Sequence, residues 1–141
     1  MKEGQSCTVL IRHLQNTLEK QLNSAMQDLD ITMSQAGALA AILEAPNGQI
    51  TLKGLEKKIQ LAQSVTAGIV TRMEQKGYIE SFGNPEDKRI KILRITPLGT
   101  TQCNNARIIL AGIENKFLSV LTEAEQENLY LTLKKLSDAT K

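Results

Sequence analysis

The chain has 141 residues, of which 41% are hydrophobic, 23% are charged and 3% are aromatic, and its net charge is +2. This is the composition of one globular domain with an aliphatic core. A single histidine, two distant cysteines and no phosphate-binding loop or HExxH motif argue against an enzyme, a metal site or another cofactor. No apolar run of 18 residues and no signal-peptide pattern occurs, which predicts a cytoplasmic protein that does not contact a membrane.

The charged residues are segregated along the chain. Residues 53–94 contain nine Lys or Arg and five Asp or Glu, a net charge of +4, whereas the remainder of the chain has a net charge of −2. A basic centre between mildly acidic flanks is typical of a protein whose middle contacts an anionic polymer. Charge alone is equally compatible with chance clustering on a solvated surface.

The first half of the chain predicts four helices separated by short breaks. The longest has an apolar residue at every fourth position from Leu10 to Met26, which indicates one hydrophobic stripe along a helix. Thr51 is placed to cap a short amphipathic helix, and Gly77 is a natural stop for the helix that follows it. These helices are expected at about residues 6–28, 35–43, 52–59 and 63–75.

The second half of the chain changes character and then returns to helix. Two runs of β-type residues flank a turn, which predicts a β-hairpin with a charged tip. Pro97 is suited to the first turn of a long helix. The expected elements are strands at 78–82 and 90–96 around a turn at 83–87, a helix at about 97–121, and a last helix after the capping box Thr122-x-x-Glu125. Helix–turn–helix followed by a hairpin predicts a mainly α (α+β) fold of the winged-helix type.

Two segments carry patterns that recur together in one family. Residues 87–99, DKRIKILRITPLG, contain D-x-R, a short strand and then T-x-x-G, and residues 72–79, RMEQKGYI, end the fourth predicted helix. Looser matches are Ile31-Thr32-x-x-Gln35 and Ile50-Thr51-Leu52. These motifs and their spacing resemble the wing and the recognition helix of the MarR/SlyA family of bacterial transcription regulators. The resemblance covers nearly the whole chain.

The resemblance implies an organisation as well as a function. It implies a single MarR-like domain over 1–141, in which 31–96 form a winged helix-turn-helix lobe that binds DNA. Residues 1–30 and 97–141 would supply dimerisation helices, and their long apolar stripes favour the same conclusion. A homodimer would place two recognition helices on successive major grooves of a pseudo-palindromic operator. The family also implies release of a repressor by a small aromatic or anionic effector, or alternatively by thiol oxidation.

The candidate DNA contacts lie on the fourth predicted helix and at the hairpin tip. The exposed helix face is compact and polar, as entry into a major groove requires. Its expected contacts are Gln63, Ser64, Ala67, Thr71 and Arg72. The expected wing contacts are Lys88, Arg89 and Lys91, with Asp87 in a structural role because its charge repels phosphate. Contacts with the DNA backbone are also expected from Ser34, Gln35 and Lys53.

Several features keep other interpretations open. Gly68 and Thr71 stand where many family members carry a larger polar residue and an aspartate, which favours a winged-helix protein–protein module without specific DNA binding as an alternative. Cys7 lies where peroxide-sensing relatives carry a reactive cysteine, but an inert thiol is the simpler interpretation. Cys103 is expected in the core.

Overall fold

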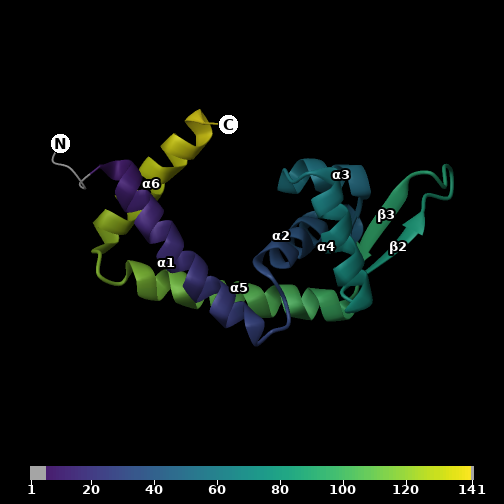
Figure 1. Cartoon of the computed structure of the whole chain (residues 1–141), viewed down its shortest axis with the longest axis horizontal. Helices are drawn as coiled ribbons and strands as arrows, with labels where there is room; N and C mark the ends of the chain where they lie inside the picture. Colours follow the sequence, from purple (N-terminus) through teal and green to yellow (C-terminus); the bar gives the residue numbers. More distant parts are fainter. Residues whose placement is uncertain (1–5, 141) are drawn as a thin grey trace. The chain divides into compact units, whose positions relative to one another are not determined.

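The computed structural model describes residues 6–140, and Figure 1 shows their helices and strands. The chain divides into two compact units, Met1–Ile109 and Leu110–Lys141, and the division falls within a helix. The larger unit contains α1 (Cys7–Gln27), α2 (Met33–Glu44), a 3-10 turn (Pro46–Gly48), β1 (Gln49–Thr51), α3 (Leu52–Ile59), α4 (Gln63–Gln75), β2 (Ile79–Gly83), β3 (Lys91–Ile95) and the first part of α5 (Pro97–Leu118). The smaller unit contains the rest of α5 and α6 (Glu123–Ala139).

The helix boundaries follow from local capping. Thr32 and Gln35 form a reciprocal capping box at the start of α2, Thr51 accepts from the Gly54 amide to cap α3, and α4 has the predicted bounds. Gly77 follows α4 with a φ of +78°, the left-handed conformation that ends a helix. The predicted mainly α, winged-helix fold is therefore confirmed.

The end of α5 differs from the prediction. The helix stops at Leu118 instead of near residue 121. The Gln126 side-chain amide donates to the carbonyls of Leu118 and Leu121, at 3.0 and 3.3 Å, and so satisfies groups that a longer helix would have bonded. The predicted Thr122–Glu125 capping box then starts α6.

The strands form one antiparallel sheet in the order β1-β3-β2. β2 and β3 are the predicted hairpin, each one residue from its expected bounds, and Figure 1 shows it projecting beyond α3 and α4. The sequence does not predict β1 as a strand. It has three residues, and its partner β3 lies more than 40 positions later, with Ile50 opposite Leu93. Such a short segment carries no visible period.

The core of the larger unit is aliphatic and centres on α2. Leu39 and Ile42 of α2 are fully buried, as are Leu55 of α3, Met73 of α4 and Leu93 of β3. These side chains therefore fix α4 and the hairpin on one scaffold by close packing. Tyr78 is the one aromatic side chain among the buried residues of the described chain.

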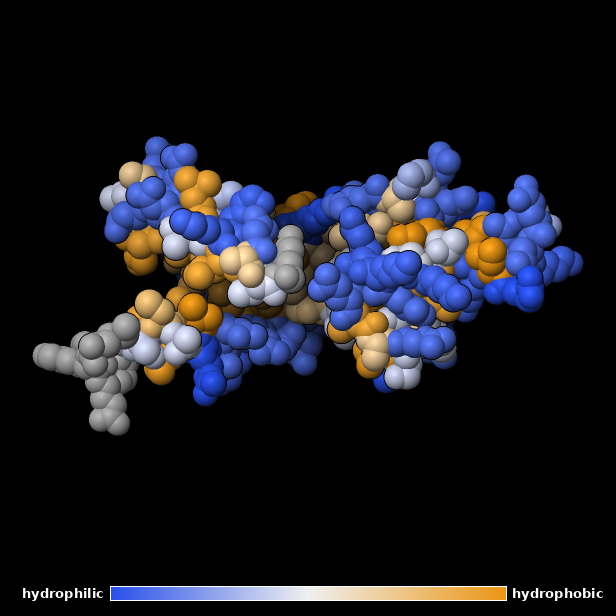
Figure 2. Space-filling model, turned by 90° about the horizontal axis from the view of Figure 1, so that it is seen from above, coloured by the Kyte–Doolittle hydropathy of each residue, from blue (hydrophilic) through white to orange (hydrophobic). Residues whose placement is uncertain are grey.

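Apolar side chains also remain on the surface. Figure 2 shows hydrophobic patches scattered among the hydrophilic surface of one face. On α1, Met26 is buried, but Leu10 and Leu14 of the same stripe are 53% and 43% exposed. On α6, the exposed apolar residues are Tyr130, Leu131, Leu133 and Leu136. None of the helices over residues 6–140 combines the length and the hydrophobicity that crossing a bilayer requires.

Candidate functional site

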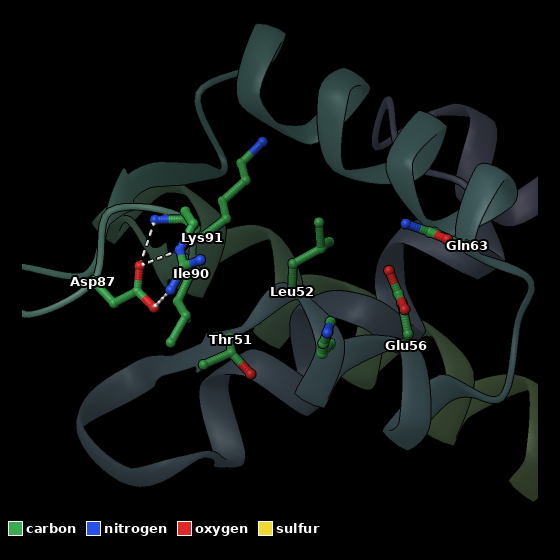
Figure 3. Close-up of a pocket in the computed structure, with 9 residues that line it drawn as sticks. Thr51, Leu52, Glu56, Gln63, Asp87, Ile90 and Lys91 are labelled. Carbon is green, nitrogen blue, oxygen red and sulfur yellow. Dashed lines mark hydrogen bonds and ion pairs between the residues drawn. The ribbon is translucent and has the colours of Figure 1, made fainter.

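A cleft lies between α3, the start of α4 and the hairpin, and Figure 3 shows its lining. Its volume is about 620 Å³. The lining residues are Thr51, Leu52, Lys53, Glu56, Gln63, Asp87, Arg89, Ile90 and Lys91. The fold thus brings three candidate contacts that are distant in sequence, Lys53, Gln63 and Arg89, to one hollow.

One face of α4 is buried and the opposite face is exposed. Thr66, Val70 and Met73 are buried, so this face packs α4 on the core, and the Thr66 hydroxyl is satisfied within the helix by donating to the Ala62 carbonyl. The opposite face is exposed and consists of Gln63, Ser64, Ala67, Gly68, Thr71 and Arg72. The Thr71 hydroxyl donates to the Ala67 carbonyl at 2.9 Å, so its oxygen is left as an acceptor. An added Cβ at Gly68 would meet nothing within 4 Å, so packing does not explain that glycine.

The hairpin tip is held by an ion pair. The Asp87 carboxylate accepts from Nε and Nη2 of Arg89, at 3.0 and 3.1 Å, and from the Arg89 amide at 3.1 Å. These hydrogen bonds to Arg89 hold the pKa of Asp87 below its ordinary value. The Arg89 side chain is still 90% exposed. Asp87 therefore orients the arginine while its guanidinium remains accessible.

Lys91 is engaged within the protein. Its ammonium lies 3.2 Å from Oε1 of Glu74, and the Ser81 hydroxyl donates to the same oxygen at 2.9 Å. Glu74 belongs to α4, whereas Ser81 and Lys91 belong to β2 and β3. Glu74 thus braces the hairpin against α4. Lys91, expected as a phosphate contact, thus also pairs with Glu74, and its side chain is 42% exposed.

The three residues expected to contact the DNA backbone differ in their exposure. Ser34 and Lys53 are exposed. Gln35 is 2% exposed, and its Oε1 accepts from the Thr32 amide and from the Lys76 ammonium. The expectation for Gln35 is therefore corrected, because its side chain is needed inside the fold and does not reach the surface.

The T-x-x-G motif joins the hairpin to α5. The Thr96 hydroxyl donates to the Gly77 carbonyl at 2.6 Å and accepts from the Gly99 amide at 3.0 Å. A Cβ at Gly99 would overlap the carbonyl oxygen of Tyr78. This position therefore requires glycine, and the motif has a structural reason.

Sequence reasoning missed the residues that brace the site. Glu74, Ser81 and Lys76 carry no local signal of this role, because no periodicity links them to their partners, which lie from seven to more than 40 positions away. In the sequence, Arg94 is recognisable only as one of the basic residues of the central segment. In the structure, its Nε donates to Gln49 Oε1 at 3.2 Å and its guanidinium lies 4.7 Å from the centre of the Phe82 ring. This contact fastens β1 to the hairpin.

Comparisons with known proteins identify the family to which this architecture belongs. The family model described as "MarR family" matches residues 31–91, which span α2 to the start of β3. The multiple antibiotic resistance protein MarR of Salmonella typhimurium is 33% identical over 94 residues, 67% of this chain. The chain belongs to the MarR family. The match to the Salmonella relative spans 64% of that protein's length.

Two other MarR-family comparisons extend over more of the chain. MarR of Escherichia coli is 27% identical over 128 residues, covering 90% of this chain and 88% of the relative. The crystal structure of a cysteine-to-serine mutant of E. coli MarR complexed with operator DNA has a TM-score of 0.78 and 27% identity, and covers 90% of each chain. The likeness to the MarR fold thus extends beyond the matched segment.

The two cysteines differ in their surroundings. Cys7 is exposed at the start of α1, and Cys103 is buried in α5, so the core position expected for Cys103 is the one observed. Burial raises the pKa of the Cys103 thiol.

Proposed function

We propose that this MarR-family chain is a homodimeric, sequence-specific DNA-binding transcriptional regulator, and that it represses by covering its operator. The observation that carries the proposal is the compact, exposed face of α4 beside an exposed arginine on the hairpin. A major groove about 12 Å wide admits a helix, and compact side chains let that helix approach the base edges closely. The hairpin would then reach the adjacent minor groove or its phosphates.

The distribution of unpaired cations supports the same interface. Of the nine basic residues in 53–94, Lys76, Arg89 and Lys91 make ion pairs within the protein, and Arg94 is engaged by Gln49 and Phe82. Within residues 6–140, the five others are exposed and make no ion pair: Lys53, Lys57 and Lys58 on α3, Arg72 on α4 and Lys88 on the hairpin. These cations are available to phosphates, whose neutralisation dominates DNA affinity.

The proposed contacts divide into two kinds. Gln63, Ser64, Ala67 and Thr71 are placed to read base edges, because glutamine can bond adenine and the methyl groups can meet thymine. Lys53, Ser34, Arg72, Lys88 and Arg89 are placed for the sugar–phosphate backbone, with Asp87 orienting Arg89. Release of the DNA by a small aromatic or anionic effector, or alternatively by oxidation of Cys7, belongs to the same proposal and is measured by adding candidate compounds or peroxide to the bound complex.

Two variants test this division. Fluorescence anisotropy would compare duplex DNA from upstream of the protein's own gene with scrambled duplex over a salt series. Arg89→Ala should weaken binding to both duplexes and flatten the plot of log affinity against log salt by about one unit. Gln63→Ala should instead reduce the preference for the operator by about 1–3 kcal/mol.

Other outcomes of the same assay would contradict the proposal. If neither the upstream DNA nor any sequence selected from random DNA is preferred, specific recognition is excluded. A folded dimer that binds no duplex at all would favour a winged-helix protein–protein interaction module, or a form that ligand or oxidation already holds in its released state. An Arg89→Ala variant that matches wild type across the salt series would remove the hairpin from the interface.

A further inference from the structure

Side chains from the connection between α4 and β2 and from α5 converge on two neighbouring carbonyls at the junction of α1 and α2. The Lys76 ammonium, just beyond α4, donates to the Asp30 carbonyl at 2.8 Å. The Tyr78 hydroxyl donates to the same carbonyl at 2.9 Å, and the Gln102 amide of α5 donates to the Leu29 carbonyl at 2.5 Å. We call Asp30, Gln35, Lys76, Tyr78 and Gln102 the junction cluster.

The junction cluster is internally connected. Lys76 also donates to Oε1 of Gln35, at 3.1 Å, and lies 3.3 Å from the Asp30 carboxylate. The Gln102 amide donates to the Tyr78 hydroxyl at 3.1 Å. Gln35 and Tyr78 are 2% and 4% exposed. Asp30 has a φ of +55°, a left-handed conformation that is uncommon for residues other than glycine but that aspartate adopts more readily than most, and the contacts to its carbonyl hold it in place.

Lys76 is the member that connects this cluster to α4. It is the C-cap residue of α4, so its backbone continues this helix while its ammonium is bonded to Asp30 between α1 and α2. Its side chain is 24% exposed and has three oxygen partners. Lys76 is thus a basic residue of the central segment whose charge is used inside the fold.

We infer that Lys76 is a positioning residue for DNA recognition, which sets the orientation of α4 from the α1–α2 junction. This inference rests on the proposed function of α4. Base reading depends on placing side chains to within a fraction of an ångström, whereas non-specific attraction to phosphates does not. The loss of Lys76 should therefore reduce specific binding more than non-specific binding.

The chain offers a clean variant for the test. Lys76→Met keeps an unbranched side chain of similar length and removes the ammonium. Both hydrogen-bonded acceptors keep another donor, because Gln35 Oε1 still accepts from the Thr32 amide and the Asp30 carbonyl still accepts from Tyr78. The variant should therefore fold. The contrast variant is Lys88→Met on the hairpin, which removes the same charge from an exposed lysine.

Anisotropy with a selected operator and with random duplex, over a salt series, separates the roles. For Lys76→Met we expect operator affinity to fall about tenfold, which is the size of one charged hydrogen bond, with random-duplex affinity and the salt slope unchanged. Lys88→Met should weaken both duplexes and flatten the salt slope. If Lys76→Met behaves like Lys88→Met, Lys76 is a phosphate contact and the inference is wrong.

Amide hydrogen exchange gives a readout that does not depend on DNA. In free Lys76→Met, amides near the end of α4 should exchange faster than in wild type, while those of α6 should not change. If neither amide exchange nor operator affinity changes in Lys76→Met, the inference about Lys76 is wrong and the proposed function is unaffected. The wild-type protein could also prefer no DNA sequence while Lys76→Met still exchanges faster. That result would overturn the proposed function and the role of Lys76 in recognition, but Lys76 would still connect α4 to the α1–α2 junction.

Discussion

Gly99 shows how one position can require a single residue type. A Cβ there would overlap the Tyr78 carbonyl oxygen and lie 2.9 Å from Ile95 Cγ1, and moving α5 away from Tyr78 would strain the hydrogen bonds that Thr96 makes with Gly77 and Gly99. We expect Gly99→Ala to lower the free energy of unfolding by roughly 3 kcal/mol or more, as overpacking against backbone does. Urea denaturation at one fixed protein concentration measures it.

The matched control for that variant is Gly37→Ala in α2. An added Cβ at Gly37 meets nothing within 4 Å. The same substitution should therefore stabilise the protein by up to about 1 kcal/mol through helix propensity. Equal effects at Gly37 and Gly99 would contradict the packing argument.

The two thiols should differ sharply in reactivity. Cys7 is exposed, whereas Cys103 is 1% exposed and burial raises its pKa, so less of its thiol ionises near neutral pH. With Ellman's reagent at about pH 7.5, one thiol should react at once and the second only as the protein unfolds. Cys7→Ser should remove the fast phase alone. A fast phase that survives in Cys7→Ser would mean that Cys103 is accessible.

At the scale of elements, the hairpin depends on Glu74 for its attachment to α4. Glu74→Ala removes the contacts to Ser81 and Lys91 and also one negative charge near the proposed DNA. Electrostatics alone predicts tighter DNA binding, whereas loss of the brace predicts weaker binding. We expect weaker binding, by about three- to tenfold, because loss of a hydrogen bond or surface ion pair costs on the order of 1 kcal/mol. Anisotropy with the operator decides the sign.

Glu80→Ala provides the matched control, because Glu80 is exposed on β2 and its removal changes the charge equally. This variant should bind DNA as tightly as wild type or slightly more tightly. If Glu74→Ala and Glu80→Ala both strengthen binding to the same extent, the brace does not matter for recognition.

The sequence predicted elements well wherever the determining signal was local. Thr51, Gly77 and the Thr122–Glu125 box set helix ends through neighbours in the chain, and the expected ends agree with the structure. β1 depends on a partner strand more than 40 positions away, and the Glu74 brace depends on how the hairpin packs beside α4, so no local pattern reveals either. Gln35 was misassigned for a related reason: a glutamine at the third position of a helix suits both a capping box and a surface contact, and only tertiary burial distinguishes the two.

At the scale of the whole molecule, the exposed apolar helices predict a dimer. Both compact units carry such residues, with Leu10 and Leu14 on α1 and Leu133 and Leu136 on α6. Patches of this kind usually mark interfaces. Leu133→Glu would bury an unpaired charge in the interface, so we expect the dimer dissociation constant to rise at least about a hundredfold. Sedimentation equilibrium measures it.

A control on the same helix separates charge from position. Asn128 is exposed and lies about 140° around α6 from Leu133, so Asn128→Glu should leave the dimer intact. If α6 is part of the dimer interface, Leu133→Glu should also lose most of its affinity for a full operator while it still binds a half-site, because one monomer covers only one major groove. A stable dimer in both variants would move the interface away from this face of α6, and the two recognition helices would then need another spacing on DNA.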